Sequence, residues 1–274
     1  MNLLIESGAT KSTCIGYNDD CTFFSYKTKG INATYATQRE IFAAIEKLIF
    51  DNKVVADRVE NVRYYGAGCF NKTNAEKVNT ILNTSFPNAQ ITVLSDLYAA
   101  CHALCNNNKG FVGILGTGAA SCFYDGKTIT AKSPSLGWLL GDEGSGTHLG
   151  KLFVTEYLKD NLALEIVQDF EKTFSVSKQI VFEKVYQSSN PQPFFSSIPF
   201  FLNKQIENKQ IKDIVKVSFR KFFDKQFDYY HEIPFSWFFC GSIAFYFQTF
   251  LMEIAHEKGI EIKKIISDCA TFLY

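Results

Sequence analysis

The chain has 274 residues, 46% of them hydrophobic and 20% charged, the composition of a folded globular protein with one large or two medium domains. Its 28 basic and 28 acidic residues give a formal net charge of zero, which argues against a nucleic-acid partner or an anionic membrane surface. Residues 1–6 lack the basic region and long apolar run of a signal peptide, and no segment approaches the roughly 20 apolar residues that span a bilayer. We therefore expect a soluble, cytoplasmic protein.

The first hairpin falls within residues 2–28. Apolar runs separated by turn-forming residues predict three strands there. The tip between the first two strands is Ser-Gly-Ala-Thr-Lys (7–11), and Asn-Asp-Asp (18–20) makes the next turn. The predicted strands are 3–6, 12–17 and 22–26.

The second hairpin repeats this order at residues 111–132. Its first strand ends in Gly-Thr-Gly (116–118), and the next apolar run turns at Asp-Gly (125–126). Backbone N–H groups at such a tip form a concave row that favours an anion, above all phosphate, although Gly-x-Gly also occurs in ordinary hairpins. Aligning the Gly-Ala pairs at 8–9 and 118–119 gives an offset of 110 residues and predicts a duplicated architecture with two facing lobes. Chance similarity of two glycine hairpins is the alternative.

Strands and helices alternate between the two hairpins, which argues for an α/β sheet with helices on its faces. The polar segment Asn-Asn-Asn-Lys-Gly (106–110) is the best boundary, so we expect lobes at 1–108 and 109–274. Residues 148–230 are mostly helical by their periodicity. The other predicted elements are helices at 40–50, 74–82, 97–104 and 243–256 and strands at 62–65, 91–94, 237–240 and 262–266.

Asp96 lies where a predicted strand stops and a helix begins. Ligands of open α/β sheets gather at the carboxyl ends of strands, and a carboxylate there can accept a proton from a substrate hydroxyl. Asp is also a favoured helix N-cap, and from position alone the cap is the simpler interpretation. Glu6, just before the first tip, could hold Mg²⁺ through water or be a plain strand-end charge. Lys11 could reach a phosphate or be a solvated surface charge.

Asp142 and Glu143 lie between glycines in Gly-Asp-Glu-Gly-Ser-Gly (141–146), before a predicted helix. The first turn of that helix could hold an anion or a hydroxyl-rich ligand, or the segment could be an ordinary acidic helix start. Gly241 and Ser242, at a strand-to-helix junction, would let a planar ring approach the backbone, or form a simple tight turn. The cysteines and histidines show neither metal-ligand spacing nor a triad partner, so buried, reduced thiols are expected. They are Cys14, Cys21, Cys69, Cys101, Cys105, Cys122, Cys240 and Cys269, with His102, His148, His231 and His256.

Taken together, these segments resemble the acetate and sugar kinase, heat-shock chaperone and actin superfamily. More narrowly, the chain is similar to the N-acetylglucosamine kinase-like branch of the BadF/BadG/BcrA/BcrD ATPase family, especially its short Bacteroidetes-type members. The matching segments span nearly the whole chain, and LGxxLGDEGSG is the most specific of them. They are residues 6–11, 30–32, 65–69, 95–97, 114–118, 136–146 and 240–244.

The resemblance implies a duplicated, two-lobed ribonuclease H-like α/β fold, the actin-like ATPase fold, with ATP, Mg²⁺ and a sugar in the interlobe cleft. The resemblance implies that Asp96 is the general base that activates a sugar hydroxyl, with N-acetylglucosamine as the expected sugar. It therefore reverses the preference for Asp96 as a helix cap. Phosphoryl transfer of this kind depends on positioning and charge neutralisation. The implied contacts are Gly8, Thr10, Lys11, Gly116, Thr117 and Gly118 for the ATP phosphates, Gly241 and Ser242 for adenosine, and Asn32, Gly68 and Asp142 for the sugar.

The chain departs from the family pattern in three places. Glu6 replaces the usual Asp, and one extra methylene shifts a carboxylate by about 1.5 Å, enough to lower the rate. Ala119 and Ala120 replace a Ser-Asn pair, which removes a hydrogen bond to the sugar. Residues 267–270 lack the usual Pro and Gly-Leu.

There are two alternatives to a sugar kinase, the first suggested by these departures and the second by the breadth of the family. One is a degenerate homologue that binds sugar or nucleotide without efficient turnover. The other is a dehydratase-activating ATPase, which needs cysteines for an iron–sulfur cluster, and no such cluster motif is visible. A homodimer is also expected, with the Phe-rich segment 194–201 as either an apolar patch or core.

Overall fold

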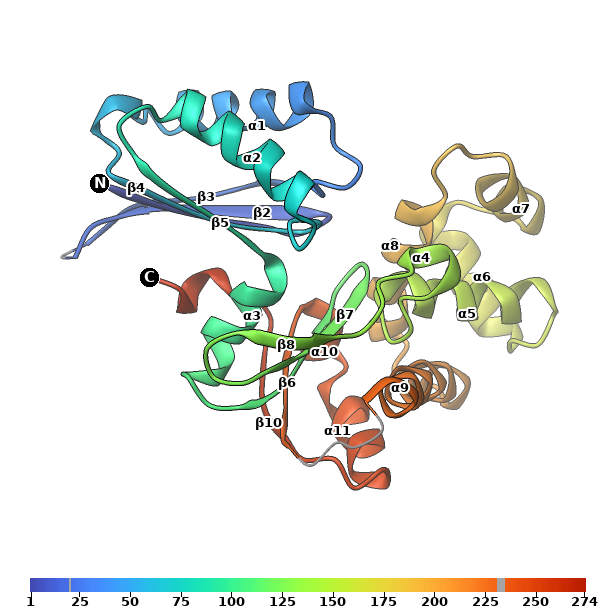
Figure 1. Cartoon of the computed structure of the whole chain (residues 1–274). Helices are drawn as coiled ribbons and strands as arrows, with labels where there is room; N and C mark the ends of the chain where they lie inside the picture. The colour runs from blue at the N-terminus through green and yellow to red at the C-terminus, as the bar shows by residue number, and fades with distance from the viewer. Residues whose placement is uncertain (20, 231–234) are drawn as a thin grey trace. The chain divides into compact units, whose positions relative to one another are not determined.

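The computed structural model describes residues 1–19, 21–230 and 235–274 (Figure 1). The chain forms two compact units, Met1–Asn107 with Asp268–Tyr274, and Asn108–Ser267. The sequence-based division assigned all of 109–274 to one lobe, whereas residues 268–274 pack with the first unit. Asp20 of the expected turn and His231 lie outside the described residues.

The first unit is built on a five-stranded sheet. Its first three strands form an antiparallel meander, and two further strands run parallel to the first. Parallel neighbours bring their carboxyl ends to one edge of the sheet, where ligands of α/β proteins gather. The strand order is β3 (Thr22–Lys29), β2 (Lys11–Tyr17), β1 (Asn2–Ser7), β4 (Asn61–Gly66), β5 (Gln90–Ser95).

Two helices cover one face of this sheet, α1 (Gln38–Asp51) and α2 (Lys72–Ser85) (Figure 1). In α1 the apolar residues Ile41, Ile45 and Leu48 recur at helical spacing and are buried in the core shared with β1 and β4. A capping box fixes the start of α1. A third helix, α3 (Asp96–Cys105), follows β5 and packs against the short η2 (Ala270–Phe272) of the same unit.

The second unit repeats the topology of the first. Three antiparallel strands are followed, after a long helical insertion, by two strands parallel to the first of them. The repeated order confirms that the chain contains two copies of one α/β architecture, as the paired hairpins predicted. The strand order is β10 (Ile262–Ile266), β9 (Trp237–Cys240), β6 (Gly110–Leu115), β7 (Ala119–Tyr124), β8 (Ile129–Lys132).

The offset expected between the two hairpins was wrong. Gly8 follows β1, and its N–H donates to the Lys11 carbonyl at 3.0 Å. Gly116 follows β6 in the same way, and its N–H donates to the Gly118 carbonyl at 3.0 Å. Gly116 is therefore the counterpart of Gly8, at an offset of 116 − 8 = 108, and the first tip is one residue longer. Gly118 closes the second tip, so its match to Gly8 is coincidental.

The helical insertion carries the aromatic core of the second unit. Phe153, Phe170 and Phe201 pack edge to face with ring centroids 4.8–5.7 Å apart. Within the Phe-rich segment, Phe195 and Phe201 are buried in the core, whereas Phe200 is 68% exposed. The helices are α4 (Gly137–Leu140), α5 (Gly146–Leu158), α6 (Leu164–Phe174), α7 (Lys178–Tyr186), α8 (Gln192–Lys204) and α9 (Lys209–Tyr230).

The helix expected at 243–256 is two helices, α10 (Ser242–Tyr246) and α11 (Gln248–Glu257). Phe247 separates them because its backbone (φ −107°, ψ 23°) lies outside the helical region while its side chain is buried. The remaining strand and helix predictions agree with the structure to within a few residues at their ends.

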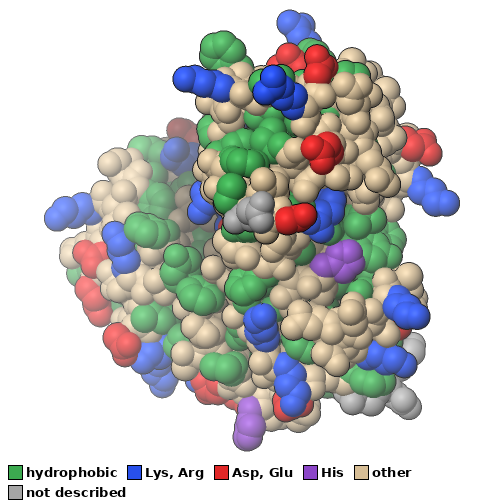
Figure 2. Space-filling view, turned by 90° about the vertical axis from the view of Figure 1, so that its left-hand side faces the viewer, with side chains coloured by type: hydrophobic (Ala, Val, Ile, Leu, Met, Phe, Trp, Pro, Cys, Tyr) green, Lys and Arg blue, Asp and Glu red, His purple; other side chains and the backbone are tan. Residues whose placement is uncertain are grey.

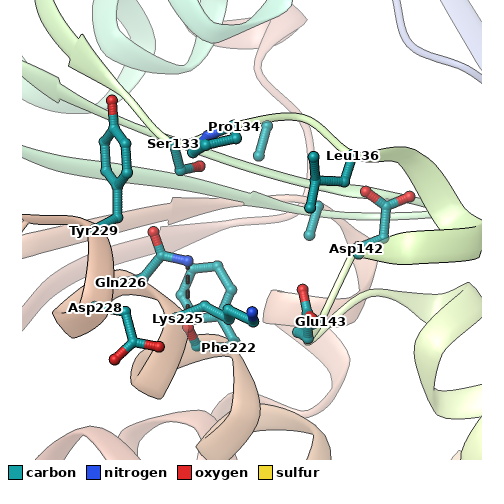
Figure 3. A pocket seen from close by; sticks show the side chains of 13 residues that line it. Ser133, Pro134, Leu136, Asp142, Glu143, Phe222, Lys225, Gln226, Asp228 and Tyr229 are labelled. Atoms are coloured by element: carbon teal, nitrogen blue, oxygen red, sulfur yellow. Dashed lines mark hydrogen bonds between the residues drawn. The ribbon is translucent and has the colours of Figure 1, made fainter.

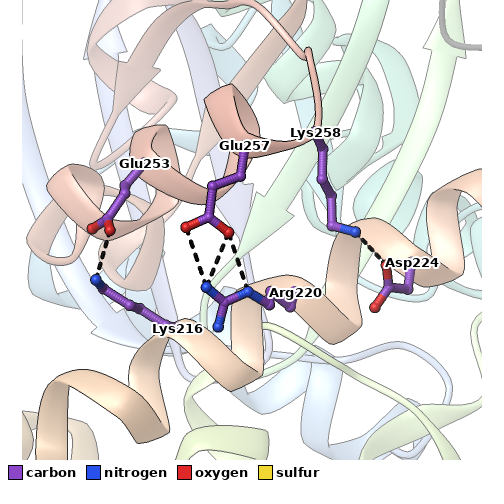
Figure 4. Close-up of polar contacts among 6 residues, drawn as sticks. All are labelled: Lys216, Arg220, Asp224, Glu253, Glu257 and Lys258. Carbon is purple, nitrogen blue, oxygen red and sulfur yellow. Dashed lines mark hydrogen bonds and ion pairs between the residues drawn. The ribbon is translucent and has the colours of Figure 1, made fainter.

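Three ion pairs join α9 to α11 (Figure 4). Lys216 pairs with Glu253 at 2.6 Å, and Lys258 pairs with Asp224 at 2.5 Å. Between them the Arg220 guanidinium makes a forked contact with both oxygens of Glu257, the shortest at 2.9 Å. The α9 partners Lys216, Arg220 and Asp224 recur every fourth residue, so they share one face of the helix.

Positive and negative side chains are interspersed over the face shown in Figure 2. Within the described residues, no helix has both the length and the apolarity to cross a membrane. The eight cysteines are free thiols, and seven of them are buried as expected. Cys21 is exposed, so the prediction of a buried thiol was wrong for this residue.

Candidate functional site

The tip of the first hairpin is exposed, and Gly30 fixes its backbone. Thr10 and Lys11 are exposed at the tip. The Gly30 N–H donates to the Thr10 carbonyl at 2.9 Å. A Cβ on Gly30 would lie 2.3 Å from the Gly8 carbonyl oxygen, so only glycine allows this close approach. The tip predicted to bind phosphate therefore has a fixed backbone with Gly8, Thr10 and Lys11 at its end.

Three charged side chains of the first unit, Lys11, Asp96 and Asp268, act on the Glu6 carboxylate. The pKa of Glu6 is raised to about 7, chiefly by burial and also by the Asp268 and Asp96 carboxylates, while the Lys11 ammonium opposes the rise. Lys11 Nζ lies 3.0 Å from Asp268 Oδ2. Sequence reasoning missed Asp268, because no local pattern shows that a residue after β10 returns to the first hairpin.

The fit of this region to Mg²⁺ rests on Glu6. A carboxylate is the hard oxygen donor that Mg²⁺ prefers, and a cation nearby would lower the raised pKa of Glu6. Within residues 1–19, 21–230 and 235–274, no group of three His, Cys, Asp or Glu side chains is arranged to ligate a metal directly. A cation held here would complete its shell with water and phosphate oxygens.

Asp96 is the first residue of α3 and directly follows β5. The N-cap is Ser95, whose hydroxyl accepts the Leu97 N–H at 3.2 Å. Asp96 Oδ1 accepts the same N–H at 3.0 Å and the Ser95 hydroxyl at 2.9 Å. The capping role that the sequence left open for Asp96 thus belongs to Ser95. The Asp96 carboxylate is oriented by these bonds at the carboxyl edge of the first sheet.

Two of the predicted sugar contacts meet in the first unit. Gly68 has a φ of +82°, and a Cβ there would lie 2.7 Å from Asn32 Oδ1 and 2.6 Å from Thr34 Oγ1. Asn32 Oδ1 accepts the Thr34 N–H at 2.9 Å, which fixes the amide. The structure therefore brings Asn32 and Gly68 into one loop cluster, where only glycine fits at position 68.

The tip of the second hairpin is anchored by the start of α5. The Gly146 N–H donates to the Gly116 carbonyl at 2.8 Å, and Thr147 donates to the Thr117 carbonyl from its N–H at 3.2 Å and its hydroxyl at 2.7 Å. In a planar trans peptide the N–H points opposite to the C=O. The N–H groups of Thr117 and Gly118 therefore point away from α5, the direction in which an anion would approach.

Asp142 lies directly against this tip. A Cβ on Gly118 would lie 2.9 Å from Asp142 Oδ2, and the Ala119 backbone donates a hydrogen bond to the same carboxylate. Burial raises the pKa of Asp142 against that bond and the nearby Lys151. Its backbone is left-handed, with a φ of +60°, a strained conformation typical of functional loops. Gly118 and Asp142, predicted for different ligands, are thus adjacent.

Gly241 also contacts the end of β6. It has a φ of +120°, and a Cβ there would lie 2.3 Å from the Leu115 carbonyl oxygen, one residue before the tip. Its N–H donates to the Ile266 carbonyl at 3.0 Å, and Ser242 begins α10. The second unit therefore brings together the glycine tip, Asp142 and the Gly241–Ser242 junction.

His148 locks the loop before α5 and was not predicted as a site residue. The Gly144 N–H donates to His148 Nδ1 at 3.4 Å, and Ser218 Oγ of α9 lies 2.8 Å from the same nitrogen. Burial lowers the pKa of His148 to about 4, helped by Lys151 and Lys221. The imidazole is therefore neutral at pH 7 and ties the Asp142 loop to α9.

A pocket of about 240 Å³ opens beside Asp142 (Figure 3). Ala119 and Ala120 of β7 form one wall of it, and α9 forms the facing wall. The α9 residues were not predicted as site residues, because a helix face carries no motif when its partners are distant in the chain. The lining residues are Ala119, Ala120, Ser133, Pro134, Leu136, Gly141, Asp142, Glu143, Phe222, Lys225, Gln226, Asp228 and Tyr229.

Comparison with known proteins gives strong structural matches. No protein-family model and no curated protein sequence matches the chain. The crystal structure of a putative N-acetylglucosamine kinase from Porphyromonas gingivalis matches with a TM-score of 0.93 and 28% identity, covering 98% of this chain and 95% of that one. A second protein of that description, from Chromobacterium violaceum, gives a TM-score of 0.78 at 12% identity over 99% and 96% of the chains.

A ROK family glucokinase from Streptomyces griseus, solved with glucose and AMPPNP, has the same fold at a TM-score of 0.59 and 11% identity, over 97% and 93% of the chains. The two duplicated sheets, the glycine tips at their edges and the similarity to the Porphyromonas protein agree with one another. The chain therefore has the actin-like ATPase fold and is similar over nearly its whole length to a putative N-acetylglucosamine kinase of that fold.

Proposed function

We propose that the protein is an ATP- and Mg²⁺-dependent kinase that phosphorylates a hydroxyl of an amino sugar, with N-acetylglucosamine as the leading substrate. The observation that carries the proposal is the position of Asp96. It follows β5, which runs parallel to β1, so Asp96 lies on the sheet edge where β1 ends in the glycine tip. A base beside a phosphate-binding tip is the arrangement that phosphoryl transfer to a hydroxyl needs.

In the proposed reaction, the Asp96 carboxylate takes the proton of the sugar hydroxyl as its oxygen forms a bond to the γ-phosphorus. The bond from that phosphorus to the β–γ bridging oxygen breaks, and ADP leaves. The N–H groups of Thr117 and Gly118 and the Lys11 ammonium bind the phosphate oxygens. Mg²⁺, held through Glu6 and water, would neutralise phosphate charge. Asn32 and Gly68 contact the sugar, together with Asp142, and Gly241 and Ser242 contact the adenosine.

Two of the comparisons support these ligands. The Porphyromonas protein carries the same substrate in its description, and the Streptomyces glucokinase was solved with an ATP analogue and a sugar. Both supports concern other proteins, so the substrate and the nucleotide are proposals for this chain.

The test is ADP release in a coupled assay with N-acetylglucosamine, glucosamine, N-acetylmuramic acid and glucose. We expect one amino sugar to stimulate turnover and Asp96→Asn to lower kcat by about 10²-fold or more, because the base is removed while the shape is kept. Asp57→Asn changes an exposed aspartate of the same unit and should leave kcat unchanged. Turnover stimulated by no sugar, or an Asp96→Asn enzyme as active as wild type, would refute the proposal.

A binding protein without efficient turnover is the second candidate. The raised pKa of Glu6, about 7, favours it, because a half-protonated carboxylate holds a cation weakly. Calorimetry that detects sugar or nucleotide binding, combined with no phosphorylated product at pH 8, would support this candidate over the kinase.

A homodimer is also proposed, with Phe200 as an exposed apolar contact. Light scattering of the purified protein should give twice the mass of one chain, and Phe200→Ser should shift it toward the monomer. A monomeric wild-type protein at micromolar concentration would contradict the dimer.

A further inference from the structure

The pocket beside Asp142 has a wall that the proposed sugar contacts do not explain. Asp228 of α9 lines it, and so do Phe222, Lys225, Gln226 and Tyr229. The spacing of three, four and seven residues from Phe222 places the last four on one face of the helix. A volume of about 240 Å³ is below the range usual for drug-sized ligands, so the pocket suits a small molecule of monosaccharide size.

The buried residues of this helix face already make contacts within the protein. Gln226 Oε1 accepts the Ser121 hydroxyl at 2.5 Å, and Gln226 Nε2 donates to the Phe222 carbonyl at 3.2 Å. Phe222 is buried and forms an apolar floor. The residues of the face that remain for a ligand are Lys225 and Tyr229, both exposed.

Lys225 and Glu143 point into the same space from opposite sides of the pocket (Figure 3). In the part of the chain that the structure describes, no carboxylate oxygen lies within 4 Å of the Lys225 ammonium. A charge pair held apart across a pocket can be bridged by adjacent hydroxyl groups, one donating to the carboxylate and one accepting from the ammonium.

The part of the wall that β7 contributes is apolar. Ala119 and Ala120 present only methyl groups, and Asp142 already accepts a hydrogen bond from the Ala119 backbone. A methyl-bearing acyl group fits such a wall better than an ionised group does, because a charge would lose its hydration there without gaining a partner. The lining carries the carboxylates of Asp142, Glu143 and Asp228 against the single ammonium of Lys225, so it likewise disfavours an anionic ligand.

We propose that α9 determines the specificity for the acceptor through Lys225 and Tyr229. The acceptor class is a neutral N-acyl hexosamine. Its hydroxyls bridge Lys225 and Glu143, one side of its ring lies on the Tyr229 ring, and its acyl group lies on Ala119 and Ala120. This inference rests on the proposed function, because it names the acceptor of that kinase. It assigns to a helix the sugar contact that the two alanines cannot make.

The experiment compares wild type with Lys225→Met, Lys225→Arg and Lys209→Met, a matched exposed lysine at the start of α9. The dissociation constant for N-acetylglucosamine is measured by calorimetry without ATP, and the KM values for sugar and ATP by ADP release. Lys225→Met should raise the sugar dissociation constant and KM about 10-fold or more, with the ATP KM within twofold. Lys225→Arg should recover most of the loss, and Lys209→Met should match wild type.

Equal sugar affinity in wild type and Lys225→Met would overturn the inference, and turnover by both would leave the kinase proposal standing. Sugar binding that is weakened by Lys225→Met, without ADP release in wild type, would support the inference and refute the kinase. Glucuronate binding more tightly than glucose would overturn the neutral acceptor class. Equal unfolding midpoints of the variants show that the fold is intact, as expected for an exposed side chain.

Discussion

The Lys11 ammonium lies 3.0 Å from the Asp268 carboxylate, so a residue that follows the last strand contacts the tip of the first hairpin. Both groups act on Glu6, whose pKa is raised to about 7 by burial, by Asp268 and by Asp96, and lowered by Lys11. The predicted phosphate-binding lysine and the predicted metal-binding carboxylate are thus coupled through a third residue.

This coupling predicts opposite changes in the pKa of Glu6. Asp268→Asn removes a negative charge that disfavours the Glu6 carboxylate, so its pKa should fall below about 7. Lys11→Met removes the positive charge that favours it, so its pKa should rise. Carbon-13 NMR titration of the Glu6 carboxyl in metal-free protein measures both. A shift in the same direction for the two variants would contradict the arrangement.

His148 predicts acid sensitivity of the second unit. Its pKa is about 4 in the folded protein and 6.5 in the unfolded chain, so the unfolded chain binds the proton first as the pH falls. The stability due to neutral His148 is complete above pH 6.5 and is lost as the pH falls through about 4, a difference of about 3 kcal/mol.

The variant His148→Gln should be less stable than wild type at pH 7.5 by about 1–3 kcal/mol, because the bonds to Gly144 and Ser218 are lost. The difference in stability should shrink or reverse at pH 4.5, because protonation of His148 then stabilises the unfolded state of wild type and has no counterpart in the variant. Urea unfolding at the two pH values measures it. A gap that stays constant with pH would show that His148 is not neutral and buried in solution.

Substitutions at two glycines near the hairpin tips should have different effects, one on stability and the other on ligand binding. A Cβ on Gly30 would lie 2.3 Å from the Gly8 carbonyl oxygen, so Gly30→Ala should displace the tip and lower stability by a few kcal/mol. A Cβ on Gly116 meets no atom within 4 Å, so Gly116→Ala should fold with nearly wild-type stability. It should nevertheless raise the KM for ATP, because the methyl group stands where phosphate approaches.

Thermal unfolding and ADP-release kinetics on both variants measure the two effects. Wild-type ATP affinity in Gly116→Ala would mean that this tip does not contact the nucleotide. Wild-type stability in Gly30→Ala would mean that the tip is not held by that close contact.

The forked contact between Arg220 and Glu257 predicts a small, salt-dependent contribution to stability. Both side chains are more than 40% exposed, so a double-mutant cycle with Arg220→Ala and Glu257→Ala should give a coupling of about 0.5–1 kcal/mol. Urea unfolding in low salt measures it, and 1 M salt should reduce it. A coupling of several kcal/mol would require a buried pair, contrary to the structure.

Local sequence predicted the features that depend on neighbouring residues. Apolar runs ending in glycine gave the central strands, and Asp96 at a strand end was placed correctly at the carboxyl edge of the first sheet. The break at Phe247 could not be predicted, because the periodicity continues through it and only its burial ends α10.

Features that depend on contacts between distant residues were missed, because no local pattern in the sequence reports them. Asp268 reaches Lys11 across most of the chain, and the α9 wall becomes a pocket only where it faces Ala119 and Ala120. The hairpin offset was wrong because a Gly-Ala pair was matched by composition, whereas the true correspondence is set by where β1 and β6 end.

The return of residues 268–274 to the first unit has a consequence for synthesis on the ribosome. Cys269, Ala270 and Leu273 are buried there, so this short segment fills part of the core of the first unit. The unit that is translated first is therefore completed last, after the whole second unit has emerged. A released chain that ends at Ser267 should therefore contain every residue of the second unit and an incomplete first unit, which should be more vulnerable to proteolysis than in the full chain.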